Sequence, residues 1–244
     1  NILPDRGYNN NNAGGFFSNY AARVQTVNFA FTPYQGSANI GGTDLSSRIA
    51  AQNQISMISP ITGQRFTYAD PTTGAQVFTT GLDPAASTRP LFGATVPFVT
   101  NYTGQGVPGQ PNSTFSNINR LTLDSEAIAL RPDGSGFIGD EYGANIYYFT
   151  SAKRIIGLIT PPAAMQPHGP VGTLNFQSTA TPVNGRRNNQ GFEGVSLSPD
   201  GTRLIAVLQS ATRQHSDAAN NQNAKHTRVL SYDVSSTNVP ITPI

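Results

Sequence analysis

The chain has 244 residues, of which 24 are glycine and 18 are proline, and only 11% are charged. Lys and Arg total 15 against 13 acidic residues, and the longest basic run is Arg186-Arg187, so the charge predicts no nucleic-acid partner. The absence of cysteine excludes disulfide scaffolds, thiolate metal sites and cysteine nucleophiles, and no apolar run approaches the roughly 18 residues of a membrane-spanning helix.

The front of the chain predicts part of a four-stranded unit over residues about 1–67. The end of a second strand is expected in "NILPDRGYN", a third strand in "AARVQTVNFAFTP" and a fourth in "NQISMISPIT". No first strand precedes them. The first residue is Asn1 rather than Met, and no basic and apolar leader follows it, so we expect a processed or trimmed product.

Residues about 68–120 differ in composition from the rest of the chain: they are rich in Gly, Pro, Thr and Asn, and their hydrophobic residues show little periodicity. They predict a long excursion between two structural units, serving as a functional cover or as surface. Asn101 and Asn112 each begin an N-x-Ser/Thr pattern in this region, which makes them candidate glycosylation sites. These two patterns favour a secreted, extracellular protein.

An internal repeat is the most informative feature of the sequence. The stretch "EAIALRPDGSGFIGDE" from Glu126 aligns without a gap to "EGVSLSPDGTRLIAVLQ" from Glu193, 67 positions further on. Each copy predicts a strand, a Pro-Asp-Gly turn and a second strand, which together form a β-hairpin.

The two copies continue differently. The first runs on through "NIYYFT" and "IIGLIT", which predicts a complete four-stranded antiparallel meander over about 121–162. The second continues after a polar loop with "TRVLSYDV", and its fourth strand is barely present, so residues about 188–244 predict a partial unit.

Tandem four-stranded antiparallel sheets are the blades of a β-propeller, which buries each blade against its neighbours. The sequence therefore predicts an all-β fold in which residues 1–244 are part of a single propeller domain. A closed ring takes about four to eight blades, so the chain is expected to be a segment of a longer propeller, whose remainder is a separate cleaved chain or a missing part. A two-sheet sandwich built from the same strands is the structural alternative.

Acidic residues gather at one end of the predicted blade. In an antiparallel hairpin the start of the first strand lies beside the end of the second, so Glu126 is expected next to Asp140 and Glu141. Asp124 lies two residues before Glu126 and points to the same side. One blade would thus present four carboxylates at one rim.

Other parts of the chain are expected at the same rim, around the mouth of the central channel. The second copy contributes Glu193 and Gln209, and the partial front blade contributes Asp5 and Arg6. Carboxylates this close repel one another unless a cation lies among them, and Ca²⁺ accepts such oxygen ligands in flexible geometry. Arg6 would act as a counter-ion or as a phosphate contact.

A structural interpretation of the same acids stays open. Asp and Glu also cap turns or pair with cations such as Arg6 and Lys153 without a further role. Asp133 and Asp200, in the Pro-Asp-Gly turns of the opposite rim, are expected to be purely structural. No G-x-S-x-G elbow occurs; "EGVSLS" comes closest and puts Ser196 on a strand, so serine esterase chemistry has no nucleophile.

Several stretches resemble the phytase-like family whose domain is labelled "esterase-like activity of phytase", in particular its extracellular fungal members. The resemblance covers most of the chain outside about 36–120 and rests on an ordered set of motifs: "LPDRGYN", "NYAARVQTVNFAFTPY", "DSEAIALRPDGSGFIGDEYGANIYYF", "IIGLITPPAAM", "NNQGFEGVSLSPDGTRLIAVLQSA" and "TRVLSYDVSS". It implies a secreted propeller with Asp and Glu residues that serve phosphoester hydrolysis, similar in architecture to calcium-dependent propeller phytases.

The resemblance carries over position by position. Asp5-Arg6 match the family's D-R-G, Asp124 and Glu126 its D-S-E-G, Asp140-Glu141 its D-E-Y-G, and Glu193 its G-F-E-G. Ala127 departs from the pattern, since it stands where the family usually has Gly, and this could narrow the approach to the channel.

The first functional hypothesis is a secreted, metal-dependent hydrolase of phosphate esters, phytase-like or diesterase-like, acting on a small phosphorylated substrate. Glu126, Glu193, Asp140 and Arg6 are its candidate catalytic residues; Asp124, Glu126, Asp140, Glu141 and Glu193 its candidate Ca²⁺ ligands; Asp5, Arg6 and Gln209 its candidate substrate contacts. The alternative is a non-catalytic extracellular propeller that binds glycan or protein and holds a structural cation. Simple carboxyl-ester hydrolysis is implied only by the family label.

Overall fold

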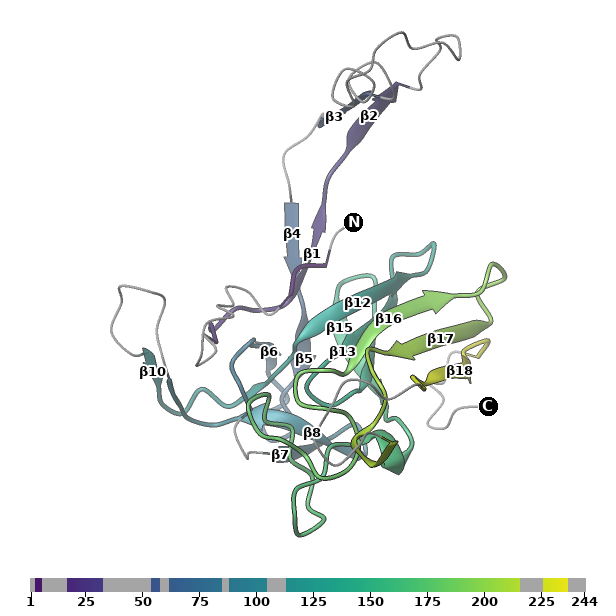
Figure 1. Cartoon of the computed structure of the whole chain (residues 1–244). Coiled ribbons are helices and arrows are strands. Elements are labelled where there is room, and N and C mark those ends of the chain that lie inside the picture. Colours follow the sequence, from purple (N-terminus) through teal and green to yellow (C-terminus); the bar gives the residue numbers. More distant parts are fainter. Residues whose placement is uncertain are drawn as a thin grey trace, which may run out of the picture. The chain divides into compact units, whose positions relative to one another are not determined.

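The computed structural model describes residues 3–5, 17–32, 54–57, 62–84, 88–104, 113–215 and 226–236. The chain divides into two compact units. The first comprises Asn1–Ile2 and Val24–Gln64, and the second comprises Leu3–Arg23 and Arg65–Ile244. Figure 1 shows both units and labels many of their strands.

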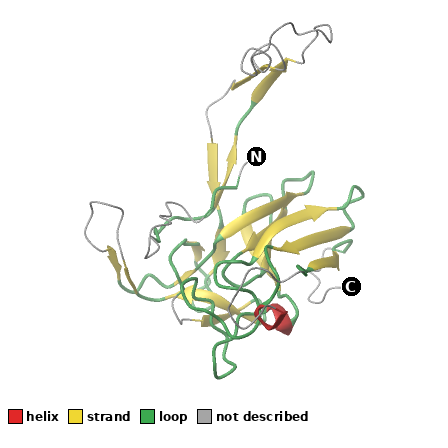
Figure 2. Cartoon of the chain, viewed as in Figure 1, coloured by secondary structure: helices red, strands yellow, loops and turns green. Residues whose placement is uncertain are grey.

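The first unit contains two small sheets. Strand β2 (Phe29–Thr32) pairs antiparallel with β3 (Gln54–Met57), and β1 (Arg23–Thr26) forms a second sheet with β4 (Thr62–Arg65). The sequence predicted strands here as neighbours in a partial blade. In the described residues they instead pair with one another in two-stranded sheets (Figure 2).

The largest sheet of the second unit is built on the predicted meander. Strands β12 (Ser125–Leu130), β13 (Gly136–Asp140), β14 (Ile146–Phe149) and β15 (Arg154–Ile159) follow one another in antiparallel order. Strand β5 (Thr67–Ala69) then pairs parallel with β15, and β6 (Gln76–Phe78) closes the edge, giving a six-stranded sheet. The meander was expected, and its extension by β5 and β6 was not.

The second copy of the repeat forms a three-stranded antiparallel sheet. It consists of β16 (Phe192–Leu197), β17 (Arg203–Leu208) and β18 (Val229–Asp233). Both copies carry the same irregularity, because the pairing register shifts between Ser125 and Ala127 in β12 and between Phe192 and Gly194 in β16. The residue displaced in each shift is the repeat glutamate, Glu126 or Glu193.

These two sheets share one hydrophobic core. Phe137, Ile146 and Ile159 from the first sheet pack in a single cluster with Phe192, Leu204 and Tyr232 from the second sheet or its edge. Strand β12 lies against β16, and a Cβ on Gly139 would come within 3.2 Å of the Phe192 carbonyl oxygen. Face-to-face stacking of the two repeats is the packing that tandem blades require.

Residues about 68–120, which were expected to form a long excursion between two structural units, contain several short strands. In addition to β5 and β6 this stretch includes β7 (Thr88–Leu91), β8 (Ala94–Val99), β9 (Tyr102–Gly104), β10 (Ser113–Phe115) and β11 (Arg120–Leu121). Strand β8 pairs with β7 and β11, and β9 pairs with β10. A second core cluster forms here around Leu82, Val99 and Tyr142.

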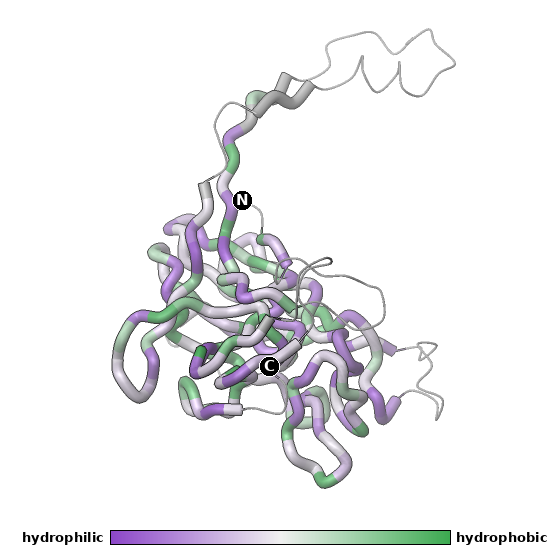
Figure 3. Tube along the Cα trace, turned by 90° about the vertical axis from the view of Figure 1, so that its left-hand side faces the viewer, coloured by the Kyte–Doolittle hydropathy of each residue, from purple (hydrophilic) through white to green (hydrophobic). Residues whose placement is uncertain are grey.

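The predicted all-β class is confirmed: within the described ranges helix is limited to two 3₁₀ turns, η1 (Ala163–Met165) and η2 (Arg213–His215). The described strands form several open sheets, and none of these sheets closes on itself. Within those same ranges no helix is long and apolar enough to cross a membrane. Short hydrophobic and hydrophilic stretches alternate along the trace in Figure 3, as expected of strands with one buried face.

Candidate active site

Three carboxylates from two distant segments meet at the start of β12. The Ser125 hydroxyl donates a hydrogen bond to the Pro4 carbonyl (2.9 Å), which holds residues 3–5 against this strand. Asp5, Asp124 and Glu126 can each direct one carboxylate oxygen so that all three oxygens lie within 4.8 Å of one another. Asp124 is buried, while Asp5 and Glu126 are partly exposed. We call these three residues the acid cluster.

Glu193 of the second repeat is electrostatically coupled to the same cluster. It occupies the bulge of β16 that matches the bulge of Glu126 in β12, and a bulge re-aims the side chain of the strand it interrupts. Partial burial of the Glu193 carboxyl and the nearby charge of Asp5 raise its pKa. Asp5 therefore links the acids of the two repeats, although it lies more than a hundred residues before either of them in the sequence.

Asp140 is fully buried and binds the backbone of the acid cluster. Its carboxylate accepts hydrogen bonds from the backbone N–H groups of Asp124 (3.0 Å) and Gly143 (2.8 Å). Burial raises its pKa to about 8, although the Gly143 amide and the charge of Arg186 act in the opposite direction. Because Asp140 holds the backbone of Asp124, it fixes the position of one member of the acid cluster.

Glu141 continues this arrangement and is also buried. Its N–H donates to the Asp124 carbonyl (2.8 Å), which extends the pairing of β12 and β13 beyond their ends. A Cβ on Gly191 would come within 2.4 Å of the Glu141 carbonyl oxygen, so only glycine allows the segment before β16 to approach this closely.

Arg186 is the counter-ion that sequence reasoning missed. Its side chain is completely buried, and its guanidinium donates to the carbonyls of Tyr142 (2.7 Å), Arg187 (2.8 Å) and Phe176 (3.1 Å). Burial lowers its pKa to about 10, while the charges of Glu141 and Asp140 oppose that shift. In the sequence it is one half of a short basic pair in a loop, and no local pattern marks it as a buried partner of these acids.

The other predicted residues have varied placements. Gln209 is exposed, and its N–H donates to the Gly191 carbonyl (2.9 Å), which puts it beside the segment that leads into β16. Asn101 is exposed, and its side-chain oxygen accepts the N–H of Asn117 (2.8 Å). Arg6 and Asn112 lie outside the described residues.

The turn aspartates are structural, as predicted. Asp133 accepts the N–H and hydroxyl of Ser135, and Asp200 accepts the hydroxyl of Ser198 and the N–H and hydroxyl of Thr202. These contacts lower the pKa of Asp200 to about 2, with the Ser198 hydroxyl contributing most.

Lys153, considered as a partner for the rim acids, instead binds at the turn end of its sheet. It donates hydrogen bonds to the carbonyls of Gly134 (2.6 Å) and Ser151 (3.1 Å). Its contacts are therefore with turn residues.

The chemistry of the acid cluster fits a hard cation. Ca²⁺ binds oxygen ligands at about 2.3–2.6 Å, so two ligands of one ion lie at most about 5 Å apart. The oxygens of Asp5, Asp124 and Glu126 satisfy this limit, and all three are carboxylate oxygens. Carboxylates at this spacing otherwise repel one another, which a bound cation would relieve.

Comparison with known proteins adds an independent observation. Residues 5–242 match the phytase-like family model described as "Esterase-like activity of phytase". An "Uncharacterized secreted protein" of Arthroderma benhamiae is 32% identical over 170 residues, which covers 61% of this chain and 33% of that protein. The chain thus spans about a third of the length of this relative.

Among solved structures, the hydrazine synthase of Kuenenia stuttgartiensis aligns with 66% of this chain and 46% of its own chain. The sequence identity is 15% and the TM-score is 0.20. A score this low carries no argument about fold or function.

Proposed function

The chain belongs to the phytase-like family, and from this premise we propose that its acid cluster is part of the active site of a phosphate-ester hydrolase. The observation that carries the proposal is the meeting of Asp5, Asp124 and Glu126 within 4.8 Å, with Glu193 coupled to Asp5. The substrate is a small phosphorylated molecule, either phytate-like or a diester.

Asp5, Asp124 and Glu126 would hold a Ca²⁺ ion. When bound, the ion would neutralise charge on a phosphoryl oxygen and increase the acidity of water. The ligand set predicted from the sequence contained Asp124, Glu126, Asp140, Glu141 and Glu193, and it gave Asp5 as a substrate contact. We assign Asp140 and Glu141 a positioning role, because their burial and backbone contacts tie them to the chain beside Asp124.

Glu193 is the candidate general base. A general base works best when its pKa approaches the pH of the reaction, and both partial burial and Asp5 raise the pKa of Glu193 toward that range. A large part of its side chain nevertheless remains exposed, so water and substrate can reach it. Gln209 is a candidate for hydrogen bonding to the substrate, and Arg6 for neutralising charge that develops on the phosphate.

The wider context is proposed on the same premise. Stacking of the two repeats supports a propeller, of which this chain supplies some of the blades and a longer polypeptide or a separate cleaved chain supplies the rest. The relative from Arthroderma benhamiae is described as secreted, and we propose an extracellular location for this protein too. Asn101 is exposed and would accept a glycan at its Nδ2 while its Oδ1 keeps the bond from Asn117.

The test is phosphate release from phytate and from a chromogenic diester, measured with added Ca²⁺ and with a chelator. We expect activity that the chelator abolishes, and we expect Glu193→Gln to lower turnover by about a hundredfold, the lower range for a general base. Asp233→Asn is the matched control, since it also neutralises an exposed carboxylate but lies on β18 beside Ser235.

Two results would contradict the proposal. One is equal turnover by Glu193→Gln and the control variant. The other is inactivity toward every phosphate ester while chelation only lowers the melting temperature, which would favour the alternative of a binding propeller with a structural cation.

A further inference from the structure

A polar pocket of about 640 Å³ lies in the second unit, and none of the acid-cluster residues lines it. Its walls come from the β5–β6 turn, from β7 and β8, and from the loop that leads into β11. The volume lies within the range of about 300–1,000 Å³ that is typical of small-molecule sites. Two arginines, Arg89 and Arg120, line it together with a single acid, Asp70.

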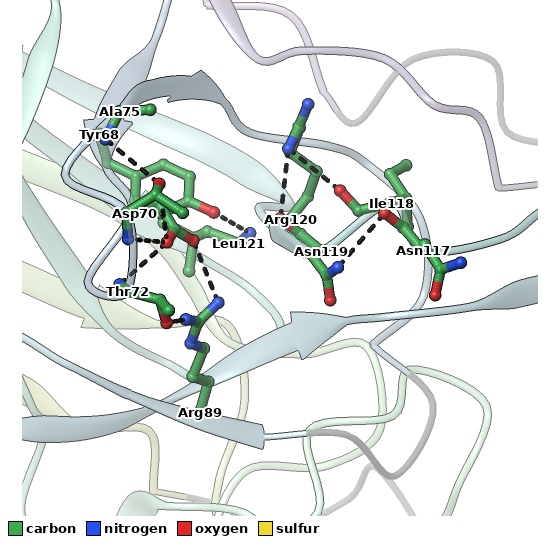
Figure 4. Close-up of polar contacts among 11 residues, drawn as sticks. Tyr68, Asp70, Thr72, Ala75, Arg89, Asn117, Ile118, Asn119, Arg120 and Leu121 are labelled. Carbon is green, nitrogen blue, oxygen red and sulfur yellow. Dashed lines mark hydrogen bonds and ion pairs between the residues drawn. The ribbon is translucent and has the colours of Figure 1, made fainter.

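The Asp70 carboxylate is hydrogen-bonded and paired with an arginine, so its charge would not repel an anionic ligand strongly. Its carboxylate accepts the N–H groups of Thr72 and Thr73 (2.9 Å each) and pairs with Arg89 (3.1 Å), as Figure 4 shows. Burial opposes ionisation, but these hydrogen bonds and the charge of Arg89 lower the pKa of Asp70. Arg89 also donates to the Thr72 hydroxyl and lies over the Phe98 ring, so this pair forms a fixed wall.

Arg120 has N–H groups that donate no hydrogen bond to the described residues. Its contacts to described residues use only Nη1, which donates to the carbonyls of Ile118 (3.0 Å) and Asn119 (3.3 Å). In Figure 4 both bonds leave one terminal nitrogen, and the other points away from these carbonyls. A guanidinium has five N–H donors in a planar fork that matches an oxyanion, so Arg120 retains donors for a ligand.

The loop beside Arg120 has a left-handed backbone conformation at two asparagines, residues that tolerate it. Asn117 and Asn119 both have positive φ angles, 54° and 45°. The loop is fixed by hydrogen bonds from Ile118 N–H to the Thr100 carbonyl (2.9 Å) and from Asn117 N–H to the Asn101 side chain (2.8 Å). These bonds fix the loop so that two amide side chains, Asn117 and Asn119, line the pocket.

We infer that this pocket binds a sugar acid or a sugar phosphate, with the oxyanion on Arg120 and the sugar hydroxyls on the surrounding threonine and asparagine side chains. The pocket is too large for an inorganic anion alone, and hydroxyl and amide groups such as those of Thr88, Thr100 and Asn119 are suited to hydroxyl ligands. This inference goes beyond the proposed hydrolase function and does not rest on it.

Calorimetric titration with glucuronate, glucose 6-phosphate and glucose tests this site. A chelator is present throughout, so that a cation at the acid cluster cannot contribute. We expect one or both charged sugars to bind and neutral glucose to bind at least about tenfold more weakly, since a charge-assisted hydrogen bond is worth about a factor of ten or more. The tighter of the two charged sugars identifies the oxyanion.

Substitutions test whether the sugar binds at this pocket. Arg120→Gln should lower the affinity for the charged sugar by about tenfold or more, whereas the control Arg154→Gln, which removes an exposed arginine of β15, should leave the affinity unchanged. Asn119→Gly removes a lining amide but keeps a residue suited to positive φ, so it should fold and weaken binding several-fold. Equal binding of glucose, no binding of either charged sugar, or unchanged binding by Arg120→Gln would overturn the inference.

Discussion

The two ends of each repeat hairpin use acidic residues in opposite ways. At the turn end, Asp133 and Asp200 bind the backbone and hydroxyls of residues two positions away, and their pKa values are lowered. At the other end, Asp140 and Glu193 have raised pKa values, because burial acts on both and the charge of distant Asp5 acts on Glu193. An acid whose partners are local stabilises a turn and stays ionised, whereas an acid placed by long-range packing has a raised pKa.

The largest expected effect is the loss of the buried counter-ion. Arg186→Met would leave Glu141 buried without the charge of Arg186 and three carbonyls without a donor. We expect the free energy of unfolding to fall by about 3–5 kcal/mol, the range for breaking a buried pair from one side. Urea unfolding measures this.

Arg154→Met is the matched control for this change, because Arg154 is exposed and its loss should cost no more than about 0.5 kcal/mol. Equal unfolding free energies for the two variants would show that Arg186 does not hold the buried end of the hairpin together.

The second prediction concerns how folding stability changes with pH, and the sign of this change should differ between the two ends of the hairpin. Asp140 has a pKa of about 8 in the folded protein against an ordinary value of 3.8, so between these values the unfolded chain has lost a proton that the native state keeps. Stability should therefore fall as pH rises through this window, and Asp140→Asn should reduce that fall. Unfolding by urea at several pH values measures it.

Asp200 should show the opposite dependence. Its folded pKa is about 2, below its ordinary value of 3.8, so its contribution is present above that value and is lost as pH falls toward 2. Asp200→Asn should consequently alter the stability profile only in the acid range. The contrast between the two ends is wrong if Asp140→Asn and Asp200→Asn change the pH dependence of stability over the same pH range.

Binding of Ca²⁺ should depend on the acids at one end of the hairpin and not on those at the turn end. The stability that it adds is expected to be smaller than the loss caused by Arg186→Met. At a free Ca²⁺ concentration about one hundred times the dissociation constant, a site present only in the native state adds about 2.7 kcal/mol of stability. Glu126→Gln removes one ligand of the acid cluster and should reduce this gain, while Asp200→Asn should leave it unchanged. The melting temperature with and without Ca²⁺ measures the effect, and an equal gain in both variants would contradict the assignment.

Local pattern and repetition made part of this structure predictable from the sequence. The Pro-Asp-Gly turns and the alternation around them specify hairpins, and the ungapped repeat makes Glu126 and Glu193 equivalent, down to the bulge that each occupies. The roles of Asp133 and Asp200 followed from turn chemistry alone, because their partners lie within two residues.

Features that depend on distant contacts were missed. The parallel pairing of Arg154 with Thr67 joins segments far apart in the sequence, and most strands between residues 67 and 121 have only two to four residues, while the longer β8 shows no alternation of buried and exposed positions. Arg186 belongs to a short basic pair, and nothing near it in the sequence indicates that it is buried beside Asp140. Such contacts become visible only once the chain is folded.

The smallest expected effect tests whether the two turns are alike. Gly134 and Gly201 have positive φ angles of 83° and 70°, so alanine at either position costs about 1–2 kcal/mol of backbone strain. A Cβ on Gly134 would lie 3.7 Å from the Ser151 Cβ, which is ordinary contact, and a Cβ on Gly201 meets nothing within 4 Å. Gly134→Ala and Gly201→Ala should therefore lower the free energy of unfolding equally, as measured in urea. A much larger loss for Gly134→Ala would mean that the Lys153 contact with the Gly134 carbonyl makes the first turn more than a local structure.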